Sequence, residues 1–234
     1  MRRVTVEAGA LDRDEVPLDA GAAHHLKDVL RLPEGELLEL CDGAGVRARG
    51  ELRAGRIVVV ERDPPRPRPR CEVTVLQGWA KGEKMDRVVR PVAELGALRF
   101  VPVHTARSVP KGGGKPDRWR AIAEDALRVS GRAYRMRVEA PQRLADLASA
   151  PADPNRLDVV FDGRGDEALA DLPATPPAAA RLLVGPEGGF EASELDVLRG
   201  RGFRVVRLGA ANLRTETAAP AALAALTLGR WGAS

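Results

Sequence analysis

Two glycine-containing segments carry the residue types best suited to hold a small ligand. The first, Val184–Phe190, reads Val-Gly-Pro-Glu-Gly-Gly-Phe and follows an apolar run. The second, Leu208–Ala218, reads Leu-Gly-Ala-Ala-Asn-Leu-Arg-Thr-Glu-Thr-Ala and also follows an apolar run. Glycine lets backbone N–H and C=O groups approach a ligand closely, and the N-terminus of a following helix attracts anions. Neither segment has the pattern of a P-loop or of a dinucleotide-binding fingerprint. The alternative is that both are tight strand-to-helix connections without a ligand.

The second segment ends in a polar cluster that is suited to catalysis. Arg214, Thr215, Glu216 and Thr217 stand between two apolar stretches. Thr215 or Thr217 would serve equally well as a helix N-cap, and Glu216 would favour the positive end of the helix. Arg214 is harder to explain as a cap, because a helix N-terminus is already electropositive. We therefore expect an anionic partner for it, either Glu216 or a group of the substrate.

Positive charge is concentrated in the middle third of the chain. Residues 71–140 contain 14 basic and 8 acidic side chains, whereas residues 1–70 contain 13 of each. Within Arg107–Arg137 there are 9 basic and 3 acidic residues, with Tyr134 among the arginines. Arginine and tyrosine suit phosphate contact and base stacking, so this region indicates nucleic-acid binding. A solvated basic surface is the alternative.

Apolar periodicity predicts that strands and helices alternate after residue 70, which is typical of an α/β fold with a parallel sheet. The ligands of such sheets bind at the carboxyl ends of the strands, where both glycine-containing segments would lie. The predicted strands are residues 73–76, 98–103, 157–161, 182–184 and 203–208. The predicted helices are residues 84–95, a helix that begins after Asp117 as its cap, residues 191–199 and residues 217–228. Gly96 is expected to end the first of these helices and Gly200 the third, and Pro91 is a candidate kink in the first.

A different pattern precedes residue 62. Short alternating runs at residues 37–41, 46–52 and 57–60, with a turn at residues 42–45, predict a small β-barrel or sandwich. Residues 24–32 are expected to form a short helix. Four prolines within residues 62–70 rule out a helix or central strand there, so we expect an extended linker between two domains.

Several classes of protein do not fit the sequence. No apolar run approaches the ~18 residues of a membrane span, and the N-terminus lacks the apolar region of a secretory signal. The two cysteines cannot form a disulfide framework or a four-ligand zinc site, and the three histidines are not at metal-ligand spacing. We therefore expect a cytoplasmic protein that binds neither a membrane nor a metal.

Taken together, the motifs resemble the RsmE family, the SPOUT-class methyltransferases that make N3-methyluridine in small-subunit (16S) ribosomal RNA. The two glycine-containing segments, in this order and spacing, carry the most specific part of the resemblance. The other matching motifs are His24-His25-Leu26, Val29–Leu32, Lys81-Gly82, Met85-Asp86, Glu94–Gly96, Arg107–Val109 and Ser130–Arg132. The sequence departs from the family pattern at Arg128-Val129, Ala211 and Pro91.

The resemblance implies a PUA-like RNA-binding β-barrel at residues 1–65 and a SPOUT α/β domain with a trefoil knot at residues 66–234. It also implies a homodimer, S-adenosylmethionine as cofactor, and ribosomal RNA or the small ribosomal subunit as partner. The residues expected to bind the cofactor are Phe161, Asp162, Leu183, Val184, Gly185, Pro186, Glu187, Gly188, Leu208, Gly209, Ala210, Asn212, Leu213 and Thr217. The residues expected to bind RNA are Arg2, Arg3, His25, Arg31, Arg107, Arg132, Tyr134 and Arg135.

N3 of uracil lies on the Watson–Crick edge, so the target base must be unpaired before methyl transfer. Loss of the N3 proton spreads negative charge to the uracil oxygens. We expect Arg214 to stabilise that charge and Glu216 to orient Arg214 or accept the proton. Two alternatives remain: an RNA-binding protein without catalysis that assists ribosome assembly, and a SPOUT enzyme that methylates another base or a ribose 2′-hydroxyl.

Overall fold

The computed structural model describes residues 2–18, 23–24, 26, 28, 30–108, 116–149, 151 and 153–231. The chain forms two compact units. The first comprises Met1–Arg68 together with Leu127–Arg135, and the second comprises Pro69–Ala126 and Met136–Ser234. The chain therefore leaves the second unit, contributes one segment to the first, and returns. The division into domains at residues 65 and 66 stays a prediction, and the sequence did not indicate this returning segment.

The first unit is built on a five-stranded sheet with the order β1-β3-β4-β5-β2. β1 runs parallel to β3, and the other neighbouring strands are antiparallel. Among the described residues, eight buried apolar side chains, Leu38, Leu40 and Ile57 among them, form its core. The strands are β1 (Arg2–Thr5), β2 (Glu15–Pro17), β3 (Leu37–Cys41), β4 (Arg47–Arg53) and β5 (Arg56–Arg62). The predicted strands at residues 37–41, 46–52 and 57–60 are thus confirmed, whereas the expected helix at residues 24–32 lies partly outside the described residues.

Close backbone packing holds Leu127–Arg135 within the first unit. The N–H of Arg135 donates to the carbonyl of Gly43 at 2.9 Å, and the N–H of Gly45 donates to the carbonyl of Ala133 at 3.0 Å. A Cβ on Gly45 would lie 2.6 Å from the Tyr134 hydroxyl, and Gly45 has a φ of 110°. Only glycine fits this turn, because its conformation and the approach of Tyr134 both exclude a side chain.

The second unit contains an eight-stranded sheet with the order β11-β13-β10-β12-β6-β7-β8, in which β9 also pairs with β7. Every strand pair in this sheet is parallel. The strands are β6 (Glu72–Gly78), β7 (Arg99–His104), β8 (Arg137–Val138), β9 (Gln142–Arg143), β10 (Arg156–Phe161), β11 (Glu167–Ala168), β12 (Ala179–Val184) and β13 (Arg204–Arg207). The predicted α/β class with a parallel sheet is confirmed; the trefoil knot stays a prediction.

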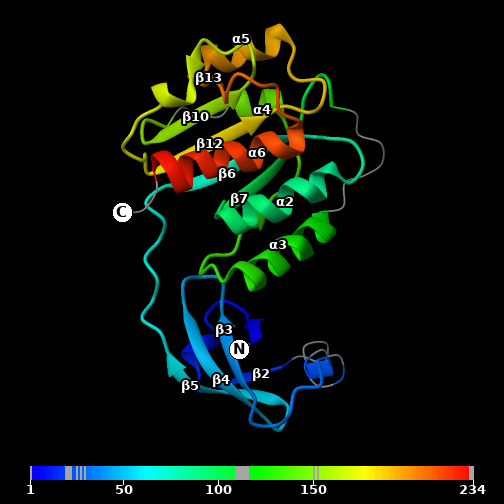
Figure 1. Cartoon of the computed structure of the whole chain (residues 1–234), viewed down its shortest axis with the longest axis vertical. Coiled ribbons are helices and arrows are strands. Elements are labelled where there is room, and N and C mark those ends of the chain that lie inside the picture. Colours follow the sequence, from blue (N-terminus) through cyan, green and yellow to red (C-terminus); the bar gives the residue numbers. More distant parts are fainter. Residues whose placement is uncertain are drawn as a thin grey trace. The chain divides into compact units, whose positions relative to one another are not determined.

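Helices cover both faces of this sheet (Figure 1). The helices are α2 (Lys84–Leu95), α3 (Pro116–Ser130), α4 (Leu144–Ser149), α5 (Ala192–Gly200) and α6 (Thr215–Ala224), which continues as a wider helical turn over Ala225–Arg230. Side chains of α2, α3 and α6 pack on one core, and those of α4 and α5 pack on the other. Successive strand residues alternate between the two cores, as Leu182 and Leu183 do, because side chains along a strand point to opposite faces.

The helix boundaries correct three expectations. Asp117 does not cap α3: it lies in the first turn, and the helix already includes Pro116, a residue favoured at the first helical position. α6 begins at Thr215 rather than at Thr217. α5 begins at Ala192, with Glu191 as its N-cap, and it ends at Gly200 as expected. Gly96 does end α2, in the left-handed conformation, and α2 remains one helix through Pro91.

Candidate functional site

A pocket of about 1100 Å³ lies at the carboxyl ends of the central strands of the second unit. Register places Phe161 at the end of β10 beside Val184 at the end of β12 and beside Val206 in β13. The segments that follow these strands therefore meet at one edge of the sheet, as expected for a parallel sheet. The residues that line the pocket are Lys84, Arg107, Phe161–Arg164, Ala168, Val184–Phe190, Arg207–Glu216 and Ala218.

The pocket brings together nearly all the residues that the sequence predicted as a cofactor site. All of them line it except Leu183 and Thr217, and the two predicted catalytic residues, Arg214 and Glu216, line it as well. Leu183 is fully buried and belongs to the opposite core, whereas Thr217 is exposed on α6. Contact with a cofactor stays a prediction for each of these residues.

Backbone rather than side chains forms part of the pocket wall. Gly163 and Gly209 line the pocket, and no atom lies within 4 Å of the position that a Cβ would take on either residue. Gly185 has no such free space, because a Cβ there would lie 3.0 Å from the ring of Phe190. Because Gly163 and Gly209 have no side chain, the space beside them is open, and a ligand there can contact the backbone directly.

Asp162 and Arg164 form an ion pair at the wall of the pocket. The Nε of Arg164 donates to Oδ1 of Asp162 at 2.8 Å, and its second nitrogen donates to Oδ2 at 2.9 Å. Arg164 also donates to the carbonyl of Phe190 at 2.9 Å, which ties the end of the first glycine loop to β10. Burial opposes ionisation of Asp162, but the hydrogen bonds and charge of Arg164 outweigh it and lower the pKa of Asp162. This carboxylate is therefore ionised at neutral pH.

Glu187 anchors the first glycine loop to the segment after β6. Its Oε1 accepts the backbone N–H of Lys81 at 3.1 Å and lies 3.0 Å from Nζ of Lys84. Burial opposes ionisation, but these hydrogen bonds and the Lys84 charge outweigh it and lower the pKa of Glu187. Arg107, which follows β7, donates to the carbonyl of Gly188 at 2.9 Å. Contacts from the segments after β6 and β7, together with that of Arg164 after β10, thus fix the loop before any ligand binds.

Arg214 and Glu216 lie on the pocket wall at the start of α6. No hydrogen bond or ion pair engages the exposed Arg214 side chain within the part of the chain that the structure describes. Oε2 of Glu216 is buried and has no hydrogen-bond partner among the described residues. Thr215, between them, does not cap the helix: its hydroxyl donates to the carbonyl of Gly185 at 2.6 Å. The expected pairing of Arg214 with Glu216 is not formed, and both groups remain available to a ligand.

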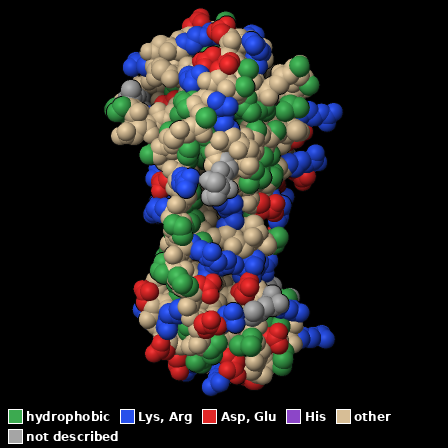
Figure 2. Space-filling model, turned by 60° about the vertical axis from the view of Figure 1, so that its left-hand side comes forward, with side chains coloured by type: hydrophobic (Ala, Val, Ile, Leu, Met, Phe, Trp, Pro, Cys, Tyr) green, Lys and Arg blue, Asp and Glu red, His purple; other side chains and the backbone are tan. Residues whose placement is uncertain are grey.

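The predicted RNA-binding residues fall into two groups. Arg2 and Arg31 are exposed on the first unit, and Arg107 is exposed at the pocket of the second. His25 lies outside the described residues. Figure 2 shows that Lys and Arg side chains are interspersed with Asp and Glu over the face it draws. RNA contact stays a prediction for all of them.

The other four residues hold the first unit together. Arg3 donates to Glu39 at 3.0 Å and to the carbonyl of Arg128, at the end of α3, at 2.6 Å. Arg135 donates to the carbonyls of Asp42 and Val6. The remaining two are partly buried: the hydroxyl of Tyr134 donates to the carbonyl of Arg66 at 2.6 Å, and burial lowers the pKa of Arg132. These contacts explain why the arginine-rich segment, Leu127–Arg135, packs within the first unit. They do not depend on RNA.

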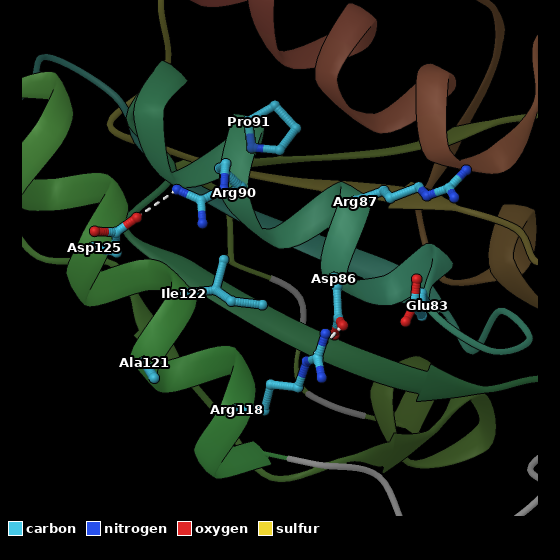
Figure 3. A pocket seen from close by; sticks show the side chains of 9 residues that line it. All are labelled: Glu83, Asp86, Arg87, Arg90, Pro91, Arg118, Ala121, Ile122 and Asp125. Carbon is cyan, nitrogen blue, oxygen red and sulfur yellow. Dashed lines mark hydrogen bonds and ion pairs between the residues drawn. The ribbon is translucent and has the colours of Figure 1, made fainter.

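A second hollow, of about 670 Å³, lies between α2 and α3. Arg118 pairs with Asp86 at 2.7 Å, and Arg90 pairs with Asp125 at 2.6 Å (Figure 3). Its three arginines are balanced by three carboxylates, so it has no excess charge for an anionic ligand.

Across the described ranges, no group of three or more His, Cys, Asp or Glu side chains is placed to hold a metal ion. None of the helices described there has the length and apolarity needed to cross a membrane.

The sequence did not indicate some residues of the site. Gly163, Arg164 and Lys84 line the pocket although no motif marks them. The sequence suggests a capping role for Thr215, and no motif marks Gln77. One feature of the sequence could have indicated Gln77: it is a polar residue at the end of an apolar strand pattern, and polar residues are unusual at fully buried positions.

Comparison with known proteins identifies the family of both parts of the chain. Residues 66–227 match a family model described as an RNA methyltransferase domain, and residues 18–60 match one described as an RNA methyltransferase PUA domain. The chain is 34% identical to the ribosomal RNA small subunit methyltransferase E of Mycobacterium bovis, over 93% of this chain and 88% of that protein. It is 28% identical to the protein of the same name from Bacillus subtilis, over 97% of this chain and 96% of that one.

Solved structures give the same result. The ribosomal RNA small subunit methyltransferase E of Neisseria gonorrhoeae, bound to S-adenosyl methionine, matches with a TM-score of 0.87 and 26% identity, over 99% of this chain and 98% of that one. A putative methyltransferase from Legionella pneumophila, in complex with the cofactor SAM, matches with a TM-score of 0.84 and 27% identity, over 96% of each chain. The chain thus belongs to the ribosomal RNA small subunit methyltransferase E family, with an N-terminal PUA domain and a C-terminal RNA methyltransferase domain.

Proposed function

We propose that this protein is an S-adenosylmethionine-dependent methyltransferase that makes N3-methyluridine in the 16S RNA of the small ribosomal subunit. The observation that carries the proposal is the backbone-lined pocket at the carboxyl ends of the central strands. Relatives with the same fold over nearly their whole length were crystallised with this cofactor. Two further expectations, the homodimer and the trefoil knot, rest on the family resemblance alone. A cytoplasmic location is proposed as well, because the proposed substrate is ribosomal RNA.

The residues present fit the cofactor. Space beside Gly163 and Gly209 is open, so an adenosyl or methionyl group can approach the backbone there without meeting a side chain. We assign cofactor binding to the segments at Val184–Gly188 and Leu208–Leu213, with Phe161 and Asp162 as a third wall. S-adenosylmethionine supplies an already activated methyl group when bound, so the chemistry needs no metal.

Arg214 and Glu216 are assigned to the uridine. The exposed guanidinium of Arg214 has no partner within the described chain, so it is available to stabilise negative charge on the uracil oxygens. The buried and unpartnered Oε2 of Glu216 is suited to accept the N3 proton or a hydrogen bond from the base. The target base must leave its helix to reach this pocket, because N3 is otherwise paired.

Substitution of Gly209 by valine tests the cofactor site directly. No atom lies within 4 Å of the new Cβ, so the fold should be unaffected while the side chain enters the ligand's space. Isothermal titration with S-adenosylmethionine should show binding to the wild type and a loss of affinity of at least about 10-fold in Gly209→Val, roughly the 1.4 kcal/mol that a displaced contact is worth. Gly200→Val is the matched control, since Gly200 is equally free of neighbours but lies at the end of α5.

The result also separates the proposal from its rival. A wild-type protein that gives no heat with S-adenosylmethionine would contradict the proposal and favour an RNA-binding protein without catalysis. Equal affinity of Gly209→Val and wild type would place the cofactor elsewhere. Methylation of another base or of a ribose 2′-hydroxyl would be recognised by mass spectrometry of the nucleosides from RNA that the protein has methylated.

A further inference from the structure

Gln77 is a fully buried polar side chain in the middle of the parallel sheet. It lies near the end of β6, where its register partners are Val184 of β12 and Pro102 of β7. Its exposed fraction is 0%. Burial of an amide costs free energy unless its hydrogen bonds are satisfied, so this residue requires a physical reason.

The amide nitrogen of Gln77 forms hydrogen bonds with both glycine-containing segments, Val184–Phe190 and Leu208–Ala218. Nε2 donates to the hydroxyl of Thr215 at 2.8 Å, and it lies 3.0 Å from the carbonyl of Gly78 and 3.4 Å from that of Gly185. The Thr215 hydroxyl in turn donates to the Gly185 carbonyl at 2.6 Å. One buried network therefore joins β6, the first glycine loop and the first residue of α6.

This network is not built for stability alone. Oε1 of Gln77 is buried and has no hydrogen-bond partner among the described residues. An unsatisfied buried acceptor is destabilising, and an apolar side chain of similar shape would avoid that cost. Thr215 and Gly185 would still be bonded to each other without Gln77. The unsatisfied oxygen offsets part of what the amide nitrogen's hydrogen bonds contribute, so stability of the fold is a weak reason for an amide at this position.

Geometry gives a reason of another kind. Thr215 stands directly between Arg214 and Glu216, and the carbonyl of Arg214 accepts the N–H groups of Thr217 and Ala218 at 2.9 and 2.8 Å. A second bond on the Thr215 hydroxyl restrains the first turn of α6 against rotation. That restraint sets the direction in which the side chains of Arg214 and Glu216 project from the helix.

We propose that Gln77 is a positioning residue: through Thr215 it holds the first turn of α6 so that Arg214 and Glu216 face the substrate. This inference rests on the proposed function. Gln77 itself does not line the pocket, so it acts through Thr215 rather than on cofactor or base.

The test compares Gln77→Met with Gln142→Met, a matched change at an exposed glutamine of β9. Urea unfolding should show Gln77→Met to be folded and close to wild type in stability, because the change removes the unsatisfied acceptor together with the donor to Thr215. The dissociation constant for S-adenosylmethionine should stay within about 3-fold of wild type. Single-turnover methyl transfer should fall about 10–100-fold, the scale expected for a misplacement of up to 1 Å.

Hydrogen exchange gives a readout that does not depend on activity. The amides of Thr217 and Ala218 report on the first turn of α6, and they should exchange faster in Gln77→Met but not in Gln142→Met. Thr215→Ser keeps the hydroxyl and should retain the wild-type rate within about 3-fold, whereas Thr215→Val should lose it. This pair provides the test in the event that Gln77→Met does not fold.

Three outcomes would overturn the inference. A Gln77→Met variant with wild-type rate and exchange would show that the amide positions nothing. A loss of stability that accounts for the whole loss of rate would make Gln77 a structural residue only. An inactive wild type would overturn the proposed function, and this inference with it, whereas the first two outcomes leave the proposed function intact.

Discussion

Replacement of Gly78 by alanine should weaken cofactor binding, although Gly78 does not touch the pocket. Gly78 ends β6 beside the turn of the first glycine loop. An added Cβ would lie 2.5 Å from both the nitrogen and Cδ of Pro186 and 2.8 Å from the carbonyl carbon of Gly185. These are backbone and ring atoms that cannot rotate away. Because carbon atoms pack at about 3.5–4.0 Å, the turn must move by roughly 1 Å.

A displacement of this size has a predictable cost. Overpacking of this kind costs about 1–3 kcal/mol in stability. Moving the loop by ~1 Å would also break about two of its hydrogen bonds to a ligand, or about 1–3 kcal/mol of binding. The dissociation constant for S-adenosylmethionine should therefore rise about 10–100-fold.

Isothermal titration with S-adenosylmethionine measures this effect, with urea unfolding in parallel to confirm that the variant is folded. Gly200→Ala is the control, because no atom lies within 4 Å of its new Cβ and Gly200 is in a helix, where alanine is favoured. A folded Gly78→Ala variant that binds the cofactor as tightly as wild type would refute the argument that the first glycine loop forms the binding wall.

Three further predictions follow from the site and the surface. Arg214→Ala should lower single-turnover methyl transfer about 10²–10³-fold with little change in cofactor affinity, and a rate within a few fold of wild type would remove its catalytic role. Replacing Arg2 and Arg31 by alanine should reduce the slope of log affinity for RNA against log salt by about one per lost phosphate contact, measured by filter binding; an unchanged slope would exclude both residues. Burial raises the pKa of Cys71 to about 11, so a thiol reagent at pH 8 should meet about one thiolate in a thousand. The reagent should therefore react slowly until the protein unfolds, and rapid reaction in the native state would contradict the partial burial of Cys71.

The sequence was most informative where structure depends on neighbouring residues. Each glycine loop follows an apolar strand and precedes a helix, so local pattern alone placed Val184–Gly188 and Leu208–Leu213 at the carboxyl end of a parallel sheet. Leu183 lies outside the pocket lining because adjacent strand residues face opposite cores. Thr217 lies outside it for a similar reason, since two residues along a helix correspond to a turn of about 200°.

Features that depend on distant segments were not predictable in this way. No local pattern indicates that β12 pairs between β6 and β10, since strand order is set by long-range packing. The docking of Leu127–Arg135 on the first unit depends on backbone contacts with Gly43 and Gly45, nearly a hundred residues earlier. Arg135 shows the consequence: its charge suggested phosphate contact, but its guanidinium donates to two carbonyl groups of the first unit.

The most direct test of the account is the product of the reaction. Purified protein, methyl-labelled S-adenosylmethionine and unmodified small-subunit ribosomal RNA, either free or in assembled subunits, would be incubated together, and the RNA digested to nucleosides for mass spectrometry. Label in N3-methyluridine is expected with wild type and should be strongly reduced with Arg214→Ala. Label in another base or in a 2′-O-methylated nucleoside, or no label with either form of the RNA, would contradict the proposed function.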